Sequence, residues 1–376
     1  MRDTPNLRIP GPTPVPSDIL EAVGWPMVDH RGRPFAALIQ RVSQRLKEFF
    51  LTKQDVLILS TSGTGSMEAA VVNTLSPGDK VLVVSIGAFG DRFAKIAETF
   101  GAEVTALPYE WGQAADPEDI RKALAADPEI TAVLVTHNET STGVTNPMEE
   151  IARVVREADR LLLVDAISSL GAIPTDMDGW GLDVVVTGSQ KGWMVPPGLA
   201  FISLSERGWQ ANQSARMPRF YMDVAKARDF LQKGQTPWTP TVSVFFGLDV
   251  ALERMAVEGL EGVHARHAKI GQMVREGIKA LGLELLATDE RYASNTVTAI
   301  KCPEGVEVAA LRRTLEDEHG VVVAGGQGKL AGKIFRIGHL GLVSEDDIDH
   351  ALNALAEVLP KVGYSIPTSR QAPQGR

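Results

Sequence analysis

The sequence predicts an α/β protein with a mostly parallel, seven-stranded sheet covered by helices on both faces and a small C-terminal α+β domain. Two observations predict this class. Short apolar runs alternate with segments of helical periodicity between residues 55 and 205. Most of these runs are continuously apolar, which is typical of strands buried on both faces of a parallel sheet. The predicted domains are residues 1–265, with an N-terminal arm at 1–14, and residues 266–364, followed by a polar tail at 365–376.

Seven segments are predicted as strands of the large sheet because each is a short run rich in valine, isoleucine and leucine. They are DVLILS (55–60), KVLVVSI (80–86), AEVTALP (102–108), TAVLVTH (131–137), LLLVDAI (161–167), DVVVTG (183–188) and LAFISLS (199–205). Ahead of them, the apolar residues from Phe35 to Phe50 recur at helical spacing. Further helices are expected between several of the strands, at 66–75, 91–100, 117–126 and 146–158.

The C-terminal part follows a different pattern. One or two long helices are predicted from about 246 to 280, and a shorter arrangement of strands and helices comes after them. Its predicted elements are strand TVTAIKC (296–302), a helix at 307–320, strands VVVAGG (321–326) and KIFRIGH (333–339), and a helix at 344–359.

The composition argues against several classes of protein. The 376 residues are 44% hydrophobic and 23% charged, with a formal net charge of −9, so nucleic acid is not an expected partner. No apolar run reaches the roughly 18 residues of a membrane span, and none near the start resembles a signal peptide. The single cysteine, Cys302, cannot form an intramolecular disulfide, which fits a cytoplasmic protein. No metal site is predicted.

Ligands of open parallel sheets bind outside the carboxyl ends of the strands, so polar residues at those ends are candidates for chemistry. The stretch LILSTSGTGSMEAAV (57–71) reads as a strand, a turn and a helix start, whose free N–H groups can hold a phosphate. Asp165 ends the most apolar run, where a lone carboxylate is costly unless it meets a cation. Lys191 follows the next run, in TGSQKGWMVPPG (187–198).

Each feature has a plainer explanation when taken alone. The turn could join a strand to a helix without any ligand. It is neither a Walker A loop nor a dinucleotide fingerprint, because no Gly-Lys-Ser/Thr follows and Glu68 stands in place of the third glycine. Asp165 could cap a helix, and Lys191 could extend from a loop to water. A phosphate- or nucleotide-binding regulator would need only the turn and would leave Asp165, Lys191 and Arg336, the arginine of the predicted strand KIFRIGH, without a role.

Together, a lysine, a carboxylate and a phosphate cradle on one rim meet the needs of pyridoxal 5′-phosphate. The aldehyde of this cofactor forms a Schiff base with a lysine, a carboxylate keeps its ring nitrogen protonated, and its phosphate needs backbone donors. We therefore predict that Lys191 carries the cofactor and that Asp165 faces its ring nitrogen.

The chain resembles the class V (fold type I) aminotransferases, and within them the alanine–glyoxylate and serine–glyoxylate group. The resemblance covers nearly the whole chain, with the motifs in the family's order and spacing. The motifs are IPGPTPVP (9–16), HRGRPF (30–35), TSGTGSMEAA (61–70), THNETSTGV (136–144), VDAISSLGA (164–172), TGSQKGWMVPPGLA (187–200) and GKIFRIGHLG (332–341).

The resemblance implies roles for residues around the cofactor. Ser62, Gly63 and Thr64 are expected to bind its phosphate, and Gln190 is expected to reach the same group. Phe89 occupies the position of an aromatic residue that stacks on the pyridine ring, where relatives often have tryptophan.

Further roles concern the substrate and a second subunit. Thr140 is expected to bond near the ring's phenolic oxygen. Arg336 matches the arginine that binds the substrate carboxylate, for which a guanidinium fork is well suited. Thr236 and Thr239 match residues that touch the phosphate of the neighbouring subunit, although many relatives have tyrosine at the first position. The resemblance therefore implies a homodimer with shared active sites.

The predicted function is transfer of an amino group from alanine or serine to glyoxylate or pyruvate. Same-fold transaminases that use aspartate, ureidoglycine, an aminophosphonate or a simple amine stay open as alternatives. A class V lyase or cysteine desulfurase is a further alternative. The desulfurase needs a nucleophilic cysteine on a mobile loop and usually a histidine before the lysine, whereas Gln190 stands there and Cys302 lies in a predicted strand.

Three more residues are weaker candidates. His30 and Arg31 would line the substrate entrance or belong to a subunit contact. His137 would contact the cofactor's surroundings or serve as a structural histidine.

Overall fold

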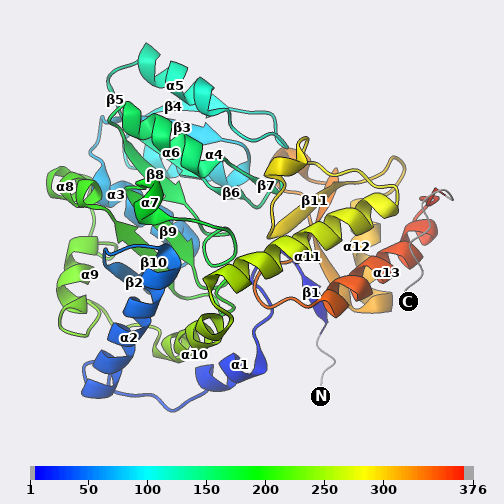
Figure 1. The fold of residues 1–376 in the computed structure, drawn as a ribbon, viewed down its shortest axis with the longest axis horizontal. Helices are drawn as coiled ribbons and strands as arrows, with labels where there is room; N and C mark the ends of the chain where they lie inside the picture. Colours follow the sequence, from blue (N-terminus) through cyan, green and yellow to red (C-terminus); the bar gives the residue numbers. More distant parts are fainter. Residues whose placement is uncertain (1–4, 368–376) are drawn as a thin grey trace.

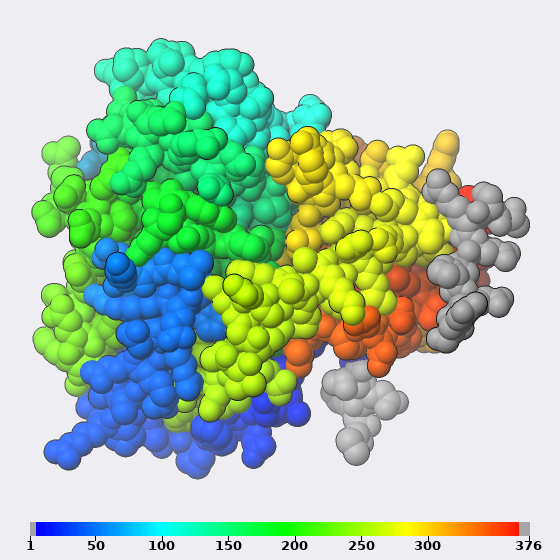
Figure 2. Space-filling view, viewed as in Figure 1, coloured from blue at the N-terminus to red at the C-terminus, as the bar shows by residue number. Residues whose placement is uncertain are grey.

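The computed structural model describes residues 5–367 and contains two main sheets. Figure 1 shows the larger sheet with its helices on the left and the smaller sheet on the right, with α11 (Leu260–Ala280) leading from one part to the other. On the face shown in Figure 2 the two parts lie directly against each other. Residues 1–4 of the predicted arm and 368–376 of the predicted tail lie outside the described residues. The division into domains stays a prediction.

The larger sheet consists of β2 (Val56–Leu59), β3 (Lys80–Ser85), β4 (Glu103–Pro108), β5 (Ile130–Thr136), β8 (Leu161–Asp165), β9 (Val184–Gly188) and β10 (Ala200–Leu204). Their order is β2-β10-β9-β8-β5-β3-β4. Only β10 runs antiparallel to its neighbours. The prediction of a mostly parallel seven-stranded sheet is confirmed, and each strand ends within two residues of its predicted bounds.

Except for the edge strand β4, whose residues are exposed or part-exposed, the strands are buried on both faces because helices cover both. Successive side chains of a strand point to opposite faces, so Leu162 and Val164 of β8 enter one core while Leu163 enters the other. The first core is closed by α2 (Arg33–Phe50), α5 (Pro117–Ala126), α6 (Met148–Glu157) and α10 (Val242–Glu258). The second is closed by α3 (Gly63–Thr74), α4 (Ala88–Thr99), α8 (Glu206–Ser214) and α9 (Val224–Leu231).

The smaller sheet has the order β1-β12-β13-β11. Its strands are β1 (Asn6–Arg8), β11 (Val297–Lys301), β12 (Val321–Gly325) and β13 (Ile334–Gly338), and its helices α11, α12 (Val308–His319) and α13 (Glu345–Lys361) enclose a third core. Three of these strands were predicted, but β1 was not, because three residues are too few for a periodic pattern. Its parallel pairing with β12 joins the N-terminal segment to this sheet.

Several short elements were also missed. They are α1 (Ser17–Val23), α7 (Met177–Trp180), α8, α9 and the hairpin of β6 (Asn138–Glu139) and β7 (Val144–Thr145). The hairpin follows β5 directly, at the edge of the larger sheet where the candidate residues lie. Within residues 5–367 no helix has the length and apolar character needed to cross a membrane.

Candidate active site

The carboxyl ends of five parallel strands form one edge of the larger sheet. β2 leads into the turn before α3, β3 leads into α4, and β5 leads into the β6–β7 hairpin. β8 ends at Asp165, and β9 is followed by Lys191. Arg336, on β13 of the smaller sheet, donates from Nη1 to the backbone oxygen of Thr140 at 3.0 Å. The candidate site therefore lies where the two sheets meet.

Lys191 is buried just beyond the end of β9, at 8% exposure. Its Nζ donates to the backbone oxygen of Pro10, on the N-terminal segment. Gly11 follows with φ of +106°, and a side chain there would come within 2.8 Å of the lysine Cδ. Burial first, and then the positive charge of Arg336, lower the pKa of Lys191 to about 8, while Asp165 opposes the shift. The amine is thus partly uncharged near neutral pH, as a nucleophile or base must be.

Asp165 is a buried carboxylate at the end of β8, at 2% exposure. Its Oδ1 accepts from the Ile167 N–H at 2.9 Å, and its Oδ2 accepts from the Thr136 hydroxyl at 3.3 Å. Burial raises the pKa of Asp165 to about 7; the charge of Glu139 adds to this shift, and that of Lys191 opposes it. A cation placed against this carboxylate would stabilise its ionised form.

The turn before α3 is an open helix N-terminus. Ser62 is the N-cap in an extended conformation, and its side chain makes no capping bond. Gly63 is the first helical residue, where an added Cβ would lie 2.8 Å from Ile167 Cδ1. Ser62 and Thr64 are exposed on either side of it. Such an N-terminus can bind an anion through its backbone N–H groups and the helix dipole.

Two side chains flank this turn. The Gln190 side-chain oxygen is buried without a hydrogen-bond partner. It lies close to Gly188, because a Cβ added to Gly188 would be 3.1 Å from this oxygen. The same Cβ would also approach Gly63. Arg92 of α4 donates to the Thr64 hydroxyl at 3.1 Å, and its guanidinium lies 4.6 Å from the Phe89 ring centre. Arg92 was not singled out from the sequence, although it stands in the segment IGAFGDR that holds Phe89.

A second residue missed by the sequence is Glu139, in THNETSTGV. Its side chain is completely buried in the β6–β7 hairpin and accepts from the backbone N–H groups of Phe89 and Gly90. Phe89 is half-buried on the first turn of α4. The sequence shows only a carboxylate within a polar stretch, and the residues that Glu139 caps lie 49 and 50 positions away, so no local pattern reveals its role.

Arg336 and Thr140 are brought together from different sheets. Arg336 is 5% exposed, and its Nε donates to the Gly325 backbone oxygen at 2.8 Å. Burial lowers the pKa of Arg336 to about 10, against the favourable charge of Glu139. The Thr140 hydroxyl donates to Ser168 Oγ at 2.8 Å. A guanidinium buried this far is well placed to bind a carboxylate in a desolvated setting.

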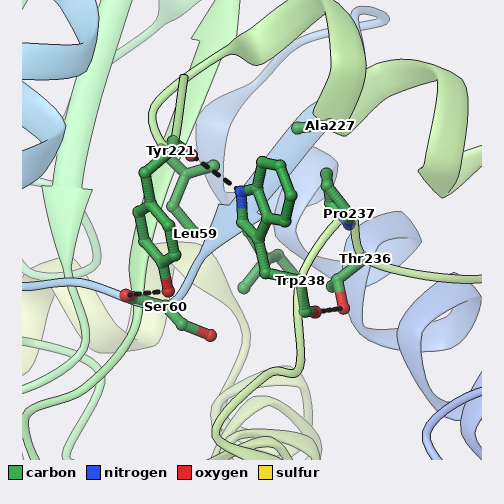
Figure 3. Close-up of a pocket in the computed structure, with 8 residues that line it drawn as sticks. Leu59, Ser60, Tyr221, Ala227, Thr236, Pro237 and Trp238 are labelled. Carbon is green, nitrogen blue, oxygen red and sulfur yellow. Dashed lines mark hydrogen bonds between the residues drawn. The ribbon is translucent and has the colours of Figure 1, made fainter. Parts of the chain in front are cut away.

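Thr236 and Thr239 lie in the segment QTPWTP (235–240), which follows α9. Thr236 lines a small pocket at the end of β2, shown in Figure 3 with Ser60, Tyr221 and Trp238. Its hydroxyl donates to the Trp238 backbone oxygen at 2.7 Å, and Thr239 is exposed. No hydrogen bond within residues 5–367 joins either threonine to the site around Lys191.

Two of the weaker candidates, Arg31 and His137, have ordinary partners. The Arg31 guanidinium donates to the Thr236 backbone oxygen at 2.6 Å and to the Gln235 side chain at 3.0 Å. His137 is buried against Trp180 and lies 3.3 Å from the Thr175 hydroxyl; burial lowers its pKa to about 4. These contacts hold loops together and give neither residue a direct contact with Lys191.

Comparisons with known proteins agree on one family. The family model "Aminotransferase class-V" matches residues 19–337. A protein named "Soluble hydrogenase, small subunit" from Synechococcus sp. is 44% identical to this chain, and the alignment covers 97% of this chain and 95% of that protein. The L-aspartate–glyoxylate aminotransferase of Paracoccus denitrificans is 39% identical, covering 90% and 86%. The solved structure of an alanine–glyoxylate aminotransferase from Nostoc sp. superposes with a TM-score of 0.92 at 32% identity, covering 96% of each chain.

Proposed function

Because the chain belongs to the class-V aminotransferase family, we propose that it moves the amino group of alanine or serine to glyoxylate or pyruvate. The enzyme class is a pyridoxal-phosphate-dependent transaminase. One observation carries the residue assignment: a buried lysine of lowered pKa, a buried carboxylate and an uncapped helix N-terminus share one edge of the sheet. These are the three groups that the cofactor requires.

The donor set fits pyridoxal 5′-phosphate. When bound, this cofactor supplies an aldehyde that links to an amine and a ring that accepts electrons from the substrate's α-carbon. Lys191 would hold the aldehyde end, Asp165 the ring nitrogen, and Ser62, Gly63 and Thr64 the phosphate. The Gln190 side-chain NH₂ group would donate to that phosphate, because its unpartnered oxygen can only accept.

The chain's own groups would then handle protons and charge. A substrate amine would first displace Lys191. The free Lys191 amine would then take the proton from the substrate's α-carbon and later donate it back, a role that the lowered pKa of Lys191 favours. Asp165 would remain ionised against a protonated ring nitrogen. Phe89 would cover one face of the ring, and Thr140 would lie by its phenolic oxygen.

The substrate assignment rests on Arg336. Its guanidinium would bind the carboxylate that amino acids and 2-oxo acids share, and its Nη2 makes no hydrogen bond within residues 5–367. Aspartate remains the second candidate donor. The Paracoccus denitrificans relative is named for it, and Arg92 places another cation beside the site.

The Synechococcus relative carries the name of a hydrogenase subunit, and that name applies to that protein. This chain has one cysteine, whereas thiolate-bound clusters use several. We keep the transaminase as the proposed function.

The remaining proposals concern the assembly of subunits, the location in the cell and the division into domains. A homodimer would bring Thr236 and Thr239 of one subunit to the phosphate of the other, as the family resemblance implies. The cytoplasm is the proposed location. The proposed domains are residues 1–265, with the arm at 1–14, and 266–364.

The experiment is an absorbance titration of the purified protein. Bound cofactor gives a visible band that changes when an amino donor converts it, so each half-reaction can be followed without a coupled assay. Alanine, serine and aspartate would be compared as donors, and glyoxylate, pyruvate and 2-oxoglutarate as acceptors. Faster reaction with aspartate or 2-oxoglutarate would move the assignment to the second candidate. Absence of any visible band at full cofactor supply would contradict the cofactor proposal.

A further inference from the structure

Glu139 is the one completely buried carboxylate at the candidate site, among the described residues, that the proposed reaction does not use. Its Oε2 accepts from the N–H groups of Phe89 at 3.0 Å and Gly90 at 3.1 Å. Its Oε1 accepts from the Ser141 N–H at 3.0 Å and from the Ser141 hydroxyl at 2.6 Å. All four lone-pair positions of the carboxylate are therefore used.

These bonds close the N-terminus of α4 from a distance. Its N-cap is Gly87, which has no side chain to cap with. The Ser141 hydroxyl also accepts from the Ala88 N–H at 2.9 Å, so Glu139 and Ser141 together bind the first three N–H groups of the helix. A helix usually takes its cap from a residue just before it. Here the cap comes from the hairpin after β5.

The same contact orders two groups at the candidate site. The helix turn that Glu139 holds carries Phe89, and the residue after Glu139 is Thr140, whose backbone oxygen binds Arg336. The fit is tight, since a Cβ on Gly87 would lie 2.4 Å from Glu139 Cγ. Movement of the Glu139 side chain would therefore shift the aromatic ring and the guanidinium together.

The charge of Glu139 also belongs to the site. Four donors and no acceptor point at the carboxylate, which favours its ionised form, although burial raises its pKa. Its negative charge acts favourably on Lys191 and Arg336 and unfavourably on Asp165. Two buried cations thus have two buried anions near them.

We propose that Glu139 is a positioning residue, which caps α4 and thereby sets where Phe89 and Arg336 stand relative to Lys191. The inference rests on the proposed function, because it needs a cofactor on Lys191 for Phe89 to cover.

The test compares Glu139→Gln with Asp183→Asn. Asp183 is the matched control: it is 1% exposed and accepts from the Leu162 N–H and the Ser205 hydroxyl, but it precedes β9 at the opposite edge of the sheet. Glutamine keeps the shape of Glu139 but replaces one carboxylate oxygen by an NH₂ group, which cannot accept the two hydrogen bonds that this oxygen receives. The measurements are Tm, cofactor content, visible circular dichroism divided by cofactor content, and kcat.

We expect both variants to have a lower Tm than the wild type. Only Glu139→Gln should change the circular dichroism per bound cofactor and lower kcat by about 100-fold, the cost of a misplacement near 1 Å at a reacting centre. Unchanged dichroism with kcat within about threefold of wild type would overturn the proposal. Equal losses in Asp183→Asn would overturn it too, since they would point to general destabilisation.

A second variant keeps the inference testable if Glu139→Gln does not fold. Ser141→Ala retains the carboxylate and removes the 2.6 Å and 2.9 Å bonds. It should show the same spectral change with a smaller loss of kcat, about tenfold, and wild-type dichroism and kcat would contradict the proposal. Failure of the proposed function itself would appear differently, as wild-type protein that shows no cofactor band.

Discussion

Arg336 offers the sharpest test of the substrate assignment. Its side chain is 5% exposed and makes hydrogen bonds to the backbone oxygens of Gly325 and Thr140. In Arg336→Ala a substrate carboxylate would enter a desolvated site without a cation. Losing one partner of a buried charge pair costs roughly 2–5 kcal/mol. At about 1.4 kcal/mol per factor of ten, this corresponds to a loss of about 30-fold to several thousand-fold in affinity.

The assay must separate binding from folding. The substitution also leaves the buried Thr140 carbonyl without its donor, at a cost of about 1–3 kcal/mol, and removes the part-buried bond to Gly325, so Tm should fall as well. The control is Arg312→Ala. Arg312 of α12 donates to the Val323 backbone oxygen of β12 at 2.9 Å and makes no hydrogen bond to the site, so it reports the cost of losing an arginine–carbonyl bond; its charge also lowers the pKa of Arg336, so the pKa of Arg336 should rise in this control.

The readout is the half-reaction absorbance change. For Arg336→Ala, kcat/KM for alanine and glyoxylate should fall at least about 30-fold, mostly through KM. The rate at which hydroxylamine, an amine without a carboxylate, releases the cofactor from Lys191 should stay within about threefold of wild type. Arg336→Lys should recover part of the loss, because it keeps the charge but not the planar fork. If alanine saturates Arg336→Ala as it does the wild type, the carboxylate binds elsewhere and the reasoning is refuted.

Four further predictions follow from the same geometry. Lys191→Ala should fold but lose turnover and the borohydride-trapped cofactor link; full multiple-turnover activity would contradict its role. Asp165→Asn should raise the activation barrier by several kcal/mol and so lower kcat roughly 10²- to 10³-fold or more, while the cofactor content stays normal. An unchanged kcat would exclude the assignment. Without cofactor, folded Asp165 keeps its proton up to about pH 7, whereas the unfolded chain releases it near 3.8. The stability of the cofactor-free protein should therefore fall as the pH rises from about 4 to about 7. Asp165→Asn should remove this decrease from a plot of Tm against pH. Sedimentation should show a dimer, and Thr236→Ala with Thr239→Ala should weaken cofactor binding; a fully active monomer at assay concentration would refute the shared site.

Much of the fold is determined by local sequence. Each strand of the larger sheet is four to seven residues long and lies in a short run rich in valine, isoleucine and leucine, which can be recognised without distant information. The order of strands and helices then places Asp165 and Lys191 on one edge, because parallel strands end on the same side. Both candidates were therefore within reach of sequence reasoning.

Other features were decided only when the chain folded. β1 is three residues long and becomes a strand by pairing with β12, more than 300 residues away. This pairing brings Pro10 to Lys191, a contact that no local pattern contains. Likewise, nothing near Glu139 shows that it caps α4 or that Arg92 reaches Thr64.

The difference has a physical cause. Periodicity and β-propensity act over a few residues, so the sequence itself determines where strands and helices form and which ends carry polar groups. Hydrogen bonds to buried charges act between atoms about 3 Å apart, whatever their separation along the chain. Which donor meets Glu139, which carbonyl holds Arg336 and which turn of backbone meets Lys191 therefore depend on how the two sheets pack, and only the tertiary structure decides them.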